Sequence, residues 1–420
     1  MENLHKSGSE TPVLLFHPGK QHSPQTALAL QQLGRLRYYA TSIFYDPARF
    51  PYYLEKVTGP VGRKLHSEFS RFEHPEIDPV LVRTWGTFEW LERAALRLGA
   101  VNLAYRLDHI GNRRFSRGLS RDIASDARFA LWGYNGSAVE AFRLAKSRGR
   151  ICILDRTIGD FRYYNRVIAE QAAIYPQFFT GEEPVIDDRR IALDDEEYAL
   201  ADRIVVGSQF CRQTIVDSSP VPGIADKIDV LPYCCNNHDF RVSAGPPRVP
   251  REGPVKFLFV GRISQRKGIH LLLEAIARFD RSEATLTLLG KMLIPKAAFA
   301  PYADRVMHVP SVAPGEVSQI MGEHHVLVLP SFFEGSAITL LEALSCGMAI
   351  IQSLQAGNGA SAATGIVLAA NTADDLEAAM RQAVDDRERI GLWRANAQLE
   401  AKRYDFGAYR DNVAALLARI

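Results

Sequence analysis

The sequence predicts an α/β fold with two domains, each built on a parallel sheet. Residues 257–279 and 326–345 each pass from a short apolar run through a loop into a stretch with apolar side chains at helical spacing. The chain has 420 residues, of which 47% are hydrophobic, and this is too long for a single core. Residues 241–254 contain four prolines and two glycines, which cannot continue a strand or helix, so a hinge between domains is expected there.

The first expected element is a strand at residues 13–16, followed by the loop HPGKQHSPQ and a helix at residues 26–32. Gly19 would allow the backbone to approach a phosphate or sugar closely, and Lys20 and His22 would add hydrogen-bond donors. A simple turn between strand and helix is the alternative interpretation. Residues 37–80 are aromatic, proline-punctuated and weakly periodic, which indicates a variable excursion without a recognisable chemistry.

Two further apolar runs, residues 129–132 and 151–154, predict strands whose carboxyl ends point into a cleft. The second run is followed by Asp155, Arg156 and Asp160. An aspartate beside an arginine at a strand end is as often a structural ion pair as a binding site. Residues 181–203 are a mixed-charge linker leading into a helix, and its clustered acids are explained by a solvated helix start more simply than by a metal.

The most informative segment is VLVLPSFFEGSAITLLEALSCGMAII, residues 326–351. It predicts a buried strand at 326–329 and a helix at 338–345, with Glu334 on the loop between them and Glu342 just over one turn into the helix. In open α/β sheets, ligands bind at the carboxyl ends of strands, which is where Glu334 is placed. Gly335 and Ser336 leave the amino terminus of the helix open to an anion.

The segment KFLFVGRISQRKGIHLLLEAIARF repeats this pattern upstream, with a strand at 257–260 and a helix at about 268–279. Arg262 and Lys267 flank its loop, and two cations beside a strand-to-helix turn suit a diphosphate. Taken singly, Glu342, Arg262 and Lys267 are each as compatible with a structural role. No GxxxxGK[ST] occurs and no GxGxxG opens a helix, which excludes a P-loop and a dinucleotide site of that kind.

The order and spacing of GRISQRKG, PSFFEG and EALSCG resemble glycosyltransferase family 4, whose members are retaining enzymes. The resemblance implies the GT-B fold, in which two Rossmann-like domains face a central cleft. It implies an acceptor-binding domain at residues 1–245, a nucleotide-sugar donor domain at 251–395, and a C-terminal helix at 396–420 that crosses back to the first domain. Expected helices at 374–384, 392–399 and 401–420 fit that order. The segment TLTLLGKML lacks a glycine that the family often carries, so the base of the donor is left open.

The resemblance also implies roles for the candidate residues. Glu334 would bind hydroxyls of the transferred sugar, Arg262 and Lys267 would neutralise the departing diphosphate, and Glu342 would accept hydrogen bonds from ribose hydroxyls. Expected catalytic residues are thus Glu334, Arg262 and Lys267. The expected donor-binding set adds Gly19, Gly261, Gly335, Ser336, Ala337 and Glu342 to those three. The expected acceptor-side set is His22, Asp155, Arg156 and Asp160.

Composition limits the other classes of function. The net charge of +2 gives no overall field that favours nucleic acid, and the five cysteines show no metal-ligand spacing. No DxD triplet occurs, so no cofactor and no metal are expected. The first residues, MENLHKSGSETP, have no apolar core for a signal peptide and no apolar stretch approaches the ~20 residues of a spanning helix. These features predict a cytoplasmic protein.

Residues 93–121 form a local basic segment, with seven arginines and one acid among interleaved leucines. Such a segment suits peripheral contact with an anionic inner membrane surface, and a solvated helix face is the alternative. The predicted function is transfer of a hexose from a nucleotide diphosphate sugar, UDP-sugar being favoured over GDP-sugar, to a carbohydrate or lipid-linked acceptor. A nucleotide-sugar epimerase and an inactive sugar-binding scaffold stay open as alternatives. A pyridoxal-dependent phosphorylase would need a much longer chain, and a periplasmic-type binder would need a secretion signal.

Overall fold

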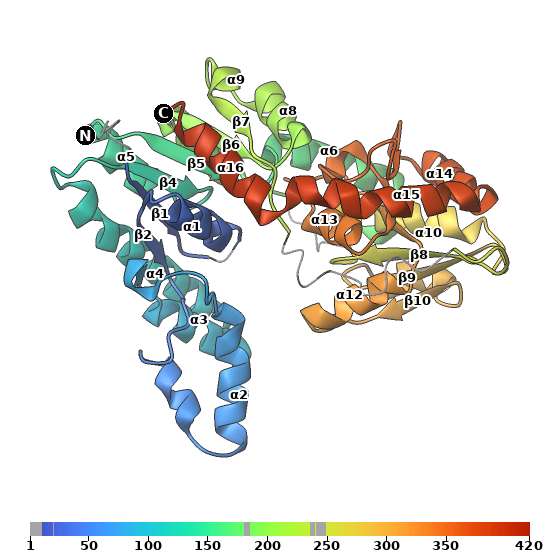
Figure 1. Ribbon diagram of the computed structural model, residues 1–420, viewed down its shortest axis with the longest axis horizontal. Helices are drawn as coiled ribbons and strands as arrows, with labels where there is room; N and C mark the ends of the chain where they lie inside the picture. Colours follow the sequence, from blue (N-terminus) through green and yellow to red (C-terminus); the bar gives the residue numbers. More distant parts are fainter. Residues whose placement is uncertain (1–10, 20, 180–184, 236–239, 241–248) are drawn as a thin grey trace, which may run out of the picture. The chain divides into compact units, whose positions relative to one another are not determined.

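The computed structural model describes residues 11–19, 21–179, 185–235, 240 and 249–420 (Figure 1). The described residues form two parallel sheets and divide into two compact units. The first unit takes its residues from Met1–Asp155, Leu193–Ile204 and Arg410–Ile420, and the second from Arg156–Ala192 and Val205–Tyr409. Most of the expected hinge at 241–254 lies outside the described residues. The domain boundaries expected at 245, 251 and 396 stay predictions.

The first sheet has seven strands in the order β3-β2-β1-β4-β5-β6-β7. The strands are β1 Val13–His17, β2 Leu36–Thr41, β3 Val82–Thr84, β4 Ala130–Tyr134, β5 Cys152–Arg156, β6 Arg203–Val206 and β7 Ile228–Val230. Every residue of β1, β4 and β5 is buried, as expected where helices cover both faces of a parallel sheet. The strands predicted near residues 13, 129 and 151 are therefore confirmed, with bounds shifted by one or two residues.

The helices between these strands follow the alternating pattern that the sequence predicted. They are α1 Ser23–Gln32, α2 Pro60–Phe69, α3 Thr87–Arg97, α4 Val101–Ile123, α5 Val139–Ser147, α6 Phe161–Ile174, α7 Asp188–Leu200, α8 Gln209–Ser218 and α9 Ile224–Lys227. The first helix begins three residues before the expected position 26. Pro24 explains the difference, because proline suits the first turn of a helix, where its missing amide proton costs nothing.

The aromatic segment at 37–80 is more ordered than its weak periodicity indicated. It supplies β2 and α2, and the rings of Tyr52, Phe69 and Phe72 pack edge-on against Trp90 at centroid distances of 5.3 to 6.2 Å. The basic segment at 93–121 lies mainly on α3 and α4, which pack against each other. In it Arg93 pairs with Glu89 at 3.0 Å.

The second sheet has six strands in the order β10-β9-β8-β11-β12-β13. The strands are β8 Val255–Val260, β9 Ala284–Leu289, β10 Val306–Val309, β11 Val326–Leu329, β12 Ala349–Gln352 and β13 Gly365–Val367. The helices are α10 Ile269–Ala277, α11 Lys296–Phe299, α12 Pro314–Gly322, α13 Ile338–Ser345, α14 Ala373–Asp385, α15 Arg387–Ala401 and α16 Phe406–Leu417. The predicted strand at 326–329 and helix at 338–345 have the observed bounds. The expected helix at 392–399 is the second half of α15, and the expected helix at 401–420 begins only at Phe406, because Asp405 has an extended backbone.

The chain order of the second sheet reverses at β8, which lies between β9 and β11. From β8 the chain first adds β9 and β10 on one side, and then returns to add β11 on the other. Such a switch point opens a crevice at the carboxyl ends of the two central strands, where open α/β sheets bind ligands. The register pairs Val326 with Phe257 and Leu327 with Leu258, so the loops that follow β8 and β11 emerge side by side.

Candidate active site

The loop after β8 lies directly against the end of β11. It forms the short 3-10 helix η5, Gln265–Lys267, and turns into α10 through Gly268, which has a φ of +70°. A Cβ atom at Gly268 would lie 1.9 Å from the carbonyl oxygen of Pro330, so only glycine fits here. This close approach brings the cations of η5 to the loop that carries Glu334.

Glu334 accepts contacts from two cations on that turn. Lys267 Nζ lies 2.6 Å and Arg266 Nη1 2.9 Å from the same atom, Glu334 Oε1. The side chains of Glu334 and Lys267 are each 11% exposed and that of Arg266 is 17% exposed, so water screens these charges weakly. Arg266 Nη1 also donates to the Phe333 carbonyl at 2.6 Å, which fixes the loop as well as the carboxylate. Lys267 and Glu334 were predicted from the sequence as members of the site, whereas Arg266 was not.

Burial and the two neighbouring positive charges shift the pKa of Glu334 in opposite directions. Burial alone would raise the pKa of the Glu334 carboxyl, but the adjacent Lys267 and Arg266 outweigh it and hold this pKa below the usual value. The carboxylate is therefore ionised at neutral pH. Burial also lowers the pKa of the Lys267 ammonium, with Glu334 opposing that shift. The result is a compact charged group, with one net positive charge, set at the switch point of the sheet.

Arg262 and Gly261 follow β8 immediately, as predicted. The Arg262 side chain is exposed and forms no ion pair with any described residue. Its charge nevertheless acts on Lys267, whose pKa it lowers as a minor cause after burial. Arg262 is therefore the cation of this loop that a ligand can reach without displacing a carboxylate.

Glu342 lies on α13 without a hydrogen-bond or ion-pair partner among the described side chains. Burial raises its pKa to about 7. Its charge acts in turn on the thiols of Cys235 and Cys346, which places these groups around it. A partly buried carboxylate without a donor is costly in a finished fold. Donors supplied by a ligand would offset that cost.

The start of α13 is held in place by backbone contacts. The Ala337 amide donates to the Ala356 carbonyl at 3.0 Å, and a donor-binding role for Ala337 stays a prediction. Gly335 is required because a Cβ atom there would lie 2.0 Å from the Thr157 carbonyl. Its own carbonyl accepts from the Ser208 hydroxyl. The buried Ser336 hydroxyl has no partner among the described residues.

Two of the four expected acceptor-side residues anchor the loop between β5 and α6. Arg156 is fully buried and donates to the carbonyls of Ile158 and Gly159 at 2.8 and 2.7 Å. Asp160 caps α6 by accepting from the Arg162 amide at 2.8 Å. These contacts account for the burial of both side chains, and an acceptor role for them stays a prediction.

The other two expected acceptor-side residues belong to the first unit. Asp155 is buried at the end of β5 and accepts from the Trp132 indole at 3.4 Å. His22 precedes α1, and burial lowers its pKa to about 4, as it does that of His17 on β1. Gly19 lies so close to the His17 ring that a Cβ atom at this position would be 2.8 Å from His17 Nε2. Lys20 lies outside the described residues. His17 and His22 beside this loop are therefore neutral at pH 7. Binding of a ligand by the loop stays a prediction.

Aromatic side chains of α6 pack on the loop that holds Glu334, which was not predicted from the sequence. The Tyr163 ring stacks on Phe333 with centroids 6.2 Å apart, and the Tyr164 ring lies 5.2 Å away. The run FRYYN, residues 161–165, was the available signal. Because Phe333 precedes Glu334, this packing helps to hold the loop that carries the carboxylate.

The comparisons with known proteins bear on this same part of the chain. Residues 246–400 match the family model described as glycosyl transferases group 1. This segment is a group 1 glycosyltransferase domain. The match contains Arg262, Arg266, Lys267, Glu334 and Glu342. The resemblance noted in the sequence is thereby confirmed for the second sheet and its loops.

A curated relative and two solved structures extend this result. Glycogen synthase of Mycobacterium tuberculosis is 30% identical over 149 residues, which are 33% of this chain and 36% of that protein. The chain therefore spans about a third of the length of this relative. Sucrose-phosphate synthase of Thermosynechococcus elongatus superposes with a TM-score of 0.63 at 15% identity, covering 97% of this chain and 98% of that one. HepE of Anabaena, in complex with UDP and glucose, gives 0.58 at 13% identity, covering 98% and 100%. These two structures show that the chain has the two-sheet GT-B fold.

Within the described part of the chain, no three histidine, cysteine, aspartate or glutamate side chains are grouped to hold a metal ion. None of the described helices is long and apolar enough to cross a membrane. The five cysteines are buried and free, and burial raises the pKa of the Cys152, Cys234, Cys235 and Cys346 thiols to about 12.

Proposed function

We propose that the protein transfers a hexose from a nucleotide diphosphate sugar to an acceptor hydroxyl, with retention of configuration. The observation that carries the proposal is the buried group of Glu334, Lys267 and Arg266 at the switch point of a group 1 glycosyltransferase domain. Because contacts within the fold already hold these charged side chains in place, they are preorganised to stabilise charge that develops in the transition state.

Departure of the nucleoside diphosphate is the step that the site must assist. Lys267 and the exposed Arg262 lie beside one turn, where they neutralise the negative charge that grows on the leaving oxygens. No metal ion is needed for that neutralisation. With retention, the departing phosphate itself takes the proton of the acceptor hydroxyl, while the sugar passes through an oxocarbenium-like transition state.

Glu334 and Glu342 have separate roles in this proposal. Both cations contact Glu334 Oε1, so the second oxygen, Oε2, accepts hydrogen bonds from hydroxyls of the transferred sugar. Glu342 has no partner of its own and accepts hydrogen bonds from the ribose hydroxyls of the nucleotide. Glu334 therefore acts on the reacting sugar, and Glu342 acts on the affinity for the donor.

We further propose a UDP-sugar as donor and a carbohydrate or lipid-linked hydroxyl as acceptor. The HepE structure is a complex with UDP and glucose, and its similarity in fold favours uridine here. Contacts to phosphate are shared by all nucleotide sugars, so they do not select the base. Peripheral contact with an anionic membrane through the arginines of α3 and α4 belongs to the same proposal.

A thermal-shift screen with UDP, GDP and ADP tests the donor site. We expect UDP to raise the melting temperature of the wild-type protein most, and Arg262→Gln to reduce that rise by removing the cation that is free to meet the diphosphate. Arg389→Gln, which removes an exposed arginine on α15, is the matched control and should leave the rise unchanged. Stabilisation by none of the three nucleotides would remove the donor-site proposal.

Product analysis separates a transferase from an epimerase. With UDP-glucose and an acceptor, a transferase yields UDP and a product heavier than the acceptor by one sugar residue, detected by mass spectrometry. Isomerised nucleotide sugar without any acceptor product would instead establish the epimerase alternative. Nucleotide binding without any turnover would favour the inactive scaffold.

A further inference from the structure

A groove with charged residues at its ends lies at the amino-terminal ends of strands in the second sheet, and the proposed transfer does not use it. It has a volume of about 530 Å³. Its floor is the amino-terminal part of three neighbouring strands, where Lys256 on β8 pairs with Thr285 on β9, and Met307 on β10 pairs with Thr287. The site described above follows the carboxyl ends of the strands. The groove is therefore separate from it.

Three cations line the groove: Lys256, Arg281 and Arg305. Among the described residues, none of them has a carboxylate within ion-pairing distance. Arg281 donates to the backbone carbonyl of Asp304, and Arg305 donates to the carbonyls of Phe279 and Ala284. Burial lowers the pKa of Arg305, and the neighbouring charge of Arg281 lowers it further. The charge of Asp280 opposes this shift, but no carboxylate forms an ion pair with either guanidinium among the described residues, so an anion beside the two arginines is favoured.

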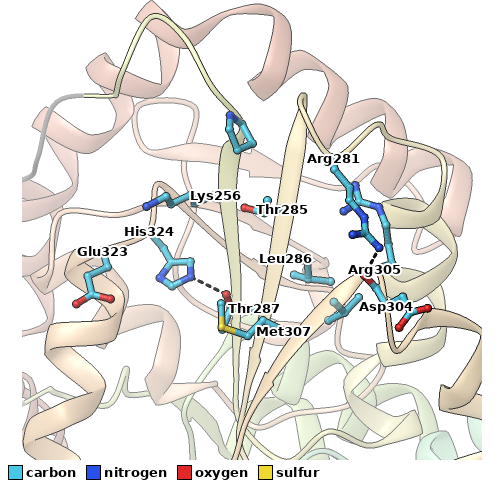
Figure 2. A pocket seen from close by; sticks show the side chains of 12 residues that line it. Lys256, Arg281, Thr285, Leu286, Thr287, Asp304, Arg305, Met307, Glu323 and His324 are labelled. Carbon is cyan, nitrogen blue, oxygen red and sulfur yellow. Dashed lines mark hydrogen bonds between the residues drawn. The ribbon is translucent and has the colours of Figure 1, made fainter.

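Hydroxyl groups lie on the floor between the charged ends (Figure 2). The Thr285 side chain is half-buried and has no hydrogen-bond partner among the described residues. Thr287 Oγ1 lies 2.8 Å from His324 Nε2, while His324 Nδ1 lies 2.7 Å from the Ile320 carbonyl. A carbonyl only accepts, so Nδ1 carries the proton and Nε2 of the neutral ring accepts from Thr287. That contact fixes Thr287 and leaves the Thr285 hydroxyl to a ligand.

Two exposed carboxylates complete the lining, one at each end of the groove. Glu323 lies on the same side as Lys256, and Asp304 lies on the same side as the two arginines (Figure 2). Neither forms an ion pair with a described residue. A simple anion would be repelled by these carboxylates, whereas a ligand that also carries hydroxyl groups would donate hydrogen bonds to them.

We propose that this groove binds a phosphorylated sugar. The cations receive the phosphate, and the carboxylates and Thr285 receive the sugar hydroxyls. Its volume lies within the range of about 300 to 1,000 Å³ that is usual for small-molecule sites. The groove lies at the ends of the strands opposite to the proposed donor site, so its ligand binds separately from the nucleotide sugar. The proposal does not depend on the transferase activity.

Isothermal titration of the full chain with glucose 6-phosphate tests the groove directly. Inorganic phosphate and glucose serve as probes of the two halves of the ligand. We expect one site per chain that binds glucose 6-phosphate more tightly than phosphate, with glucose alone too weak to measure. Saturable binding of glucose as tight as that of its phosphate would overturn the role of the cations.

Three variants locate the binding. The double variant Lys256→Gln/Arg281→Gln should weaken binding at least about tenfold, because contacts to charged groups are usually worth that much or more. The matched control Arg389→Gln/Lys402→Gln, which removes two exposed cations of the same unit, should bind as the wild type does. Arg262→Gln, which alters the donor site, should also bind as the wild type does. Unchanged binding in the groove variant, or loss only in Arg262→Gln, would overturn the proposal.

The Glu323→Gln variant tests the sugar half. An amide accepts hydrogen bonds less well than a carboxylate and does not repel an anion. The preference for glucose 6-phosphate over inorganic phosphate should therefore shrink by several-fold, with the affinity for phosphate unchanged or higher. An undiminished preference would show that the carboxylates do not select a sugar.

Discussion

Breaking the contact between Lys267 and Glu334 separates a structural role from a chemical one. In Lys267→Met, Glu334 keeps only Arg266, and in Glu334→Gln two buried cations lose their shared carboxylate. Removing one partner of a buried ion pair typically costs roughly 3 to 5 kcal/mol. Since Arg266 remains at 2.9 Å, we expect Lys267→Met at the lower end of that range and Glu334→Gln near its upper end.

The double variant Lys267→Met/Glu334→Gln removes one charge of each sign. It should recover part of the stability lost in Glu334→Gln, because Arg266 is then the only buried charge of the group. It should recover no turnover, because neither the cation near the diphosphate nor the carboxylate near the sugar returns. We expect all three variants to turn over at least about a hundredfold more slowly than the wild type, which corresponds to roughly 3 kcal/mol in the transition state.

Two measurements check this pair of expectations. Urea unfolding gives the stability of each variant, and release of nucleoside diphosphate at saturating donor gives the turnover. Arg381→Met, which breaks the surface contact of Arg381 with Glu283 at 2.8 Å, is the control for loss of an ion pair away from the site. It should turn over as the wild type does. Recovery of turnover together with stability in the double variant would refute the catalytic role of the pair.

Four further expectations concern the rest of the proposed site and the basic helices. Because burial raises the folded-state pKa of Glu342 to about 7 from the 4.5 of a free glutamate, the wild type loses stability as pH rises from about 4.5 to about 7. Glu342→Gln should therefore be more stable than the wild type at pH 8, by up to roughly 3 kcal/mol, and have no such advantage at pH 4. Its KM for the donor should rise with little change in kcat. Arg266→Lys keeps the charge but replaces the planar guanidinium, whose Nη1 donates to both Glu334 and the Phe333 carbonyl, with a more mobile point charge on a shorter side chain. We therefore expect kcat to fall about tenfold with donor KM near the wild-type value, and equal kinetics would limit Arg266 to folding. Activity should survive EDTA, and a complete loss restored by magnesium or manganese would contradict a metal-independent mechanism. Anionic vesicles should sediment the wild type more than neutral ones do, and the combined variant Arg106→Gln/Arg117→Gln/Arg121→Gln should remove that difference, since each basic residue near such a surface contributes about 1 kcal/mol.

The local pattern of apolar residues in the sequence was sufficient to predict the strand and the helix that carry the candidate site. The strand at 326–329 and the helix at 338–345 were predicted with their observed bounds, because a buried parallel strand is continuously apolar and Pro330 ends it. The last helices were predicted less well. There α15 and α16 are separated by an extended residue, Asp405, in a run whose composition permits an unbroken helix.

Contacts between distant parts of the chain could not be predicted in this way. Arg266 is 68 positions from Glu334, and nothing in the run GRISQRKG distinguishes Arg266, which contacts the carboxylate, from Arg262, which is exposed. The direction of the Arg266 side chain follows from the 3-10 turn and from Gly268, whose fit against Pro330 exists only in the folded sheet. The packing of Tyr163 on Phe333 has the same origin.

The partners of Glu334 and Glu342 are the reason for proposing different roles for two glutamates of one segment. Glu334 has two cations in the fold itself, so its charge is present at neutral pH whether or not a substrate is bound. Glu342 has no cation near enough to pair with among the described residues, and burial leaves its pKa close to neutrality. An ionised carboxylate held in place suits a reacting sugar, because reorientation during the reaction would raise the barrier. A carboxylate without donors gains most from the ribose hydroxyls of a ligand, so its removal should be felt in the affinity for the donor before it is felt in the rate.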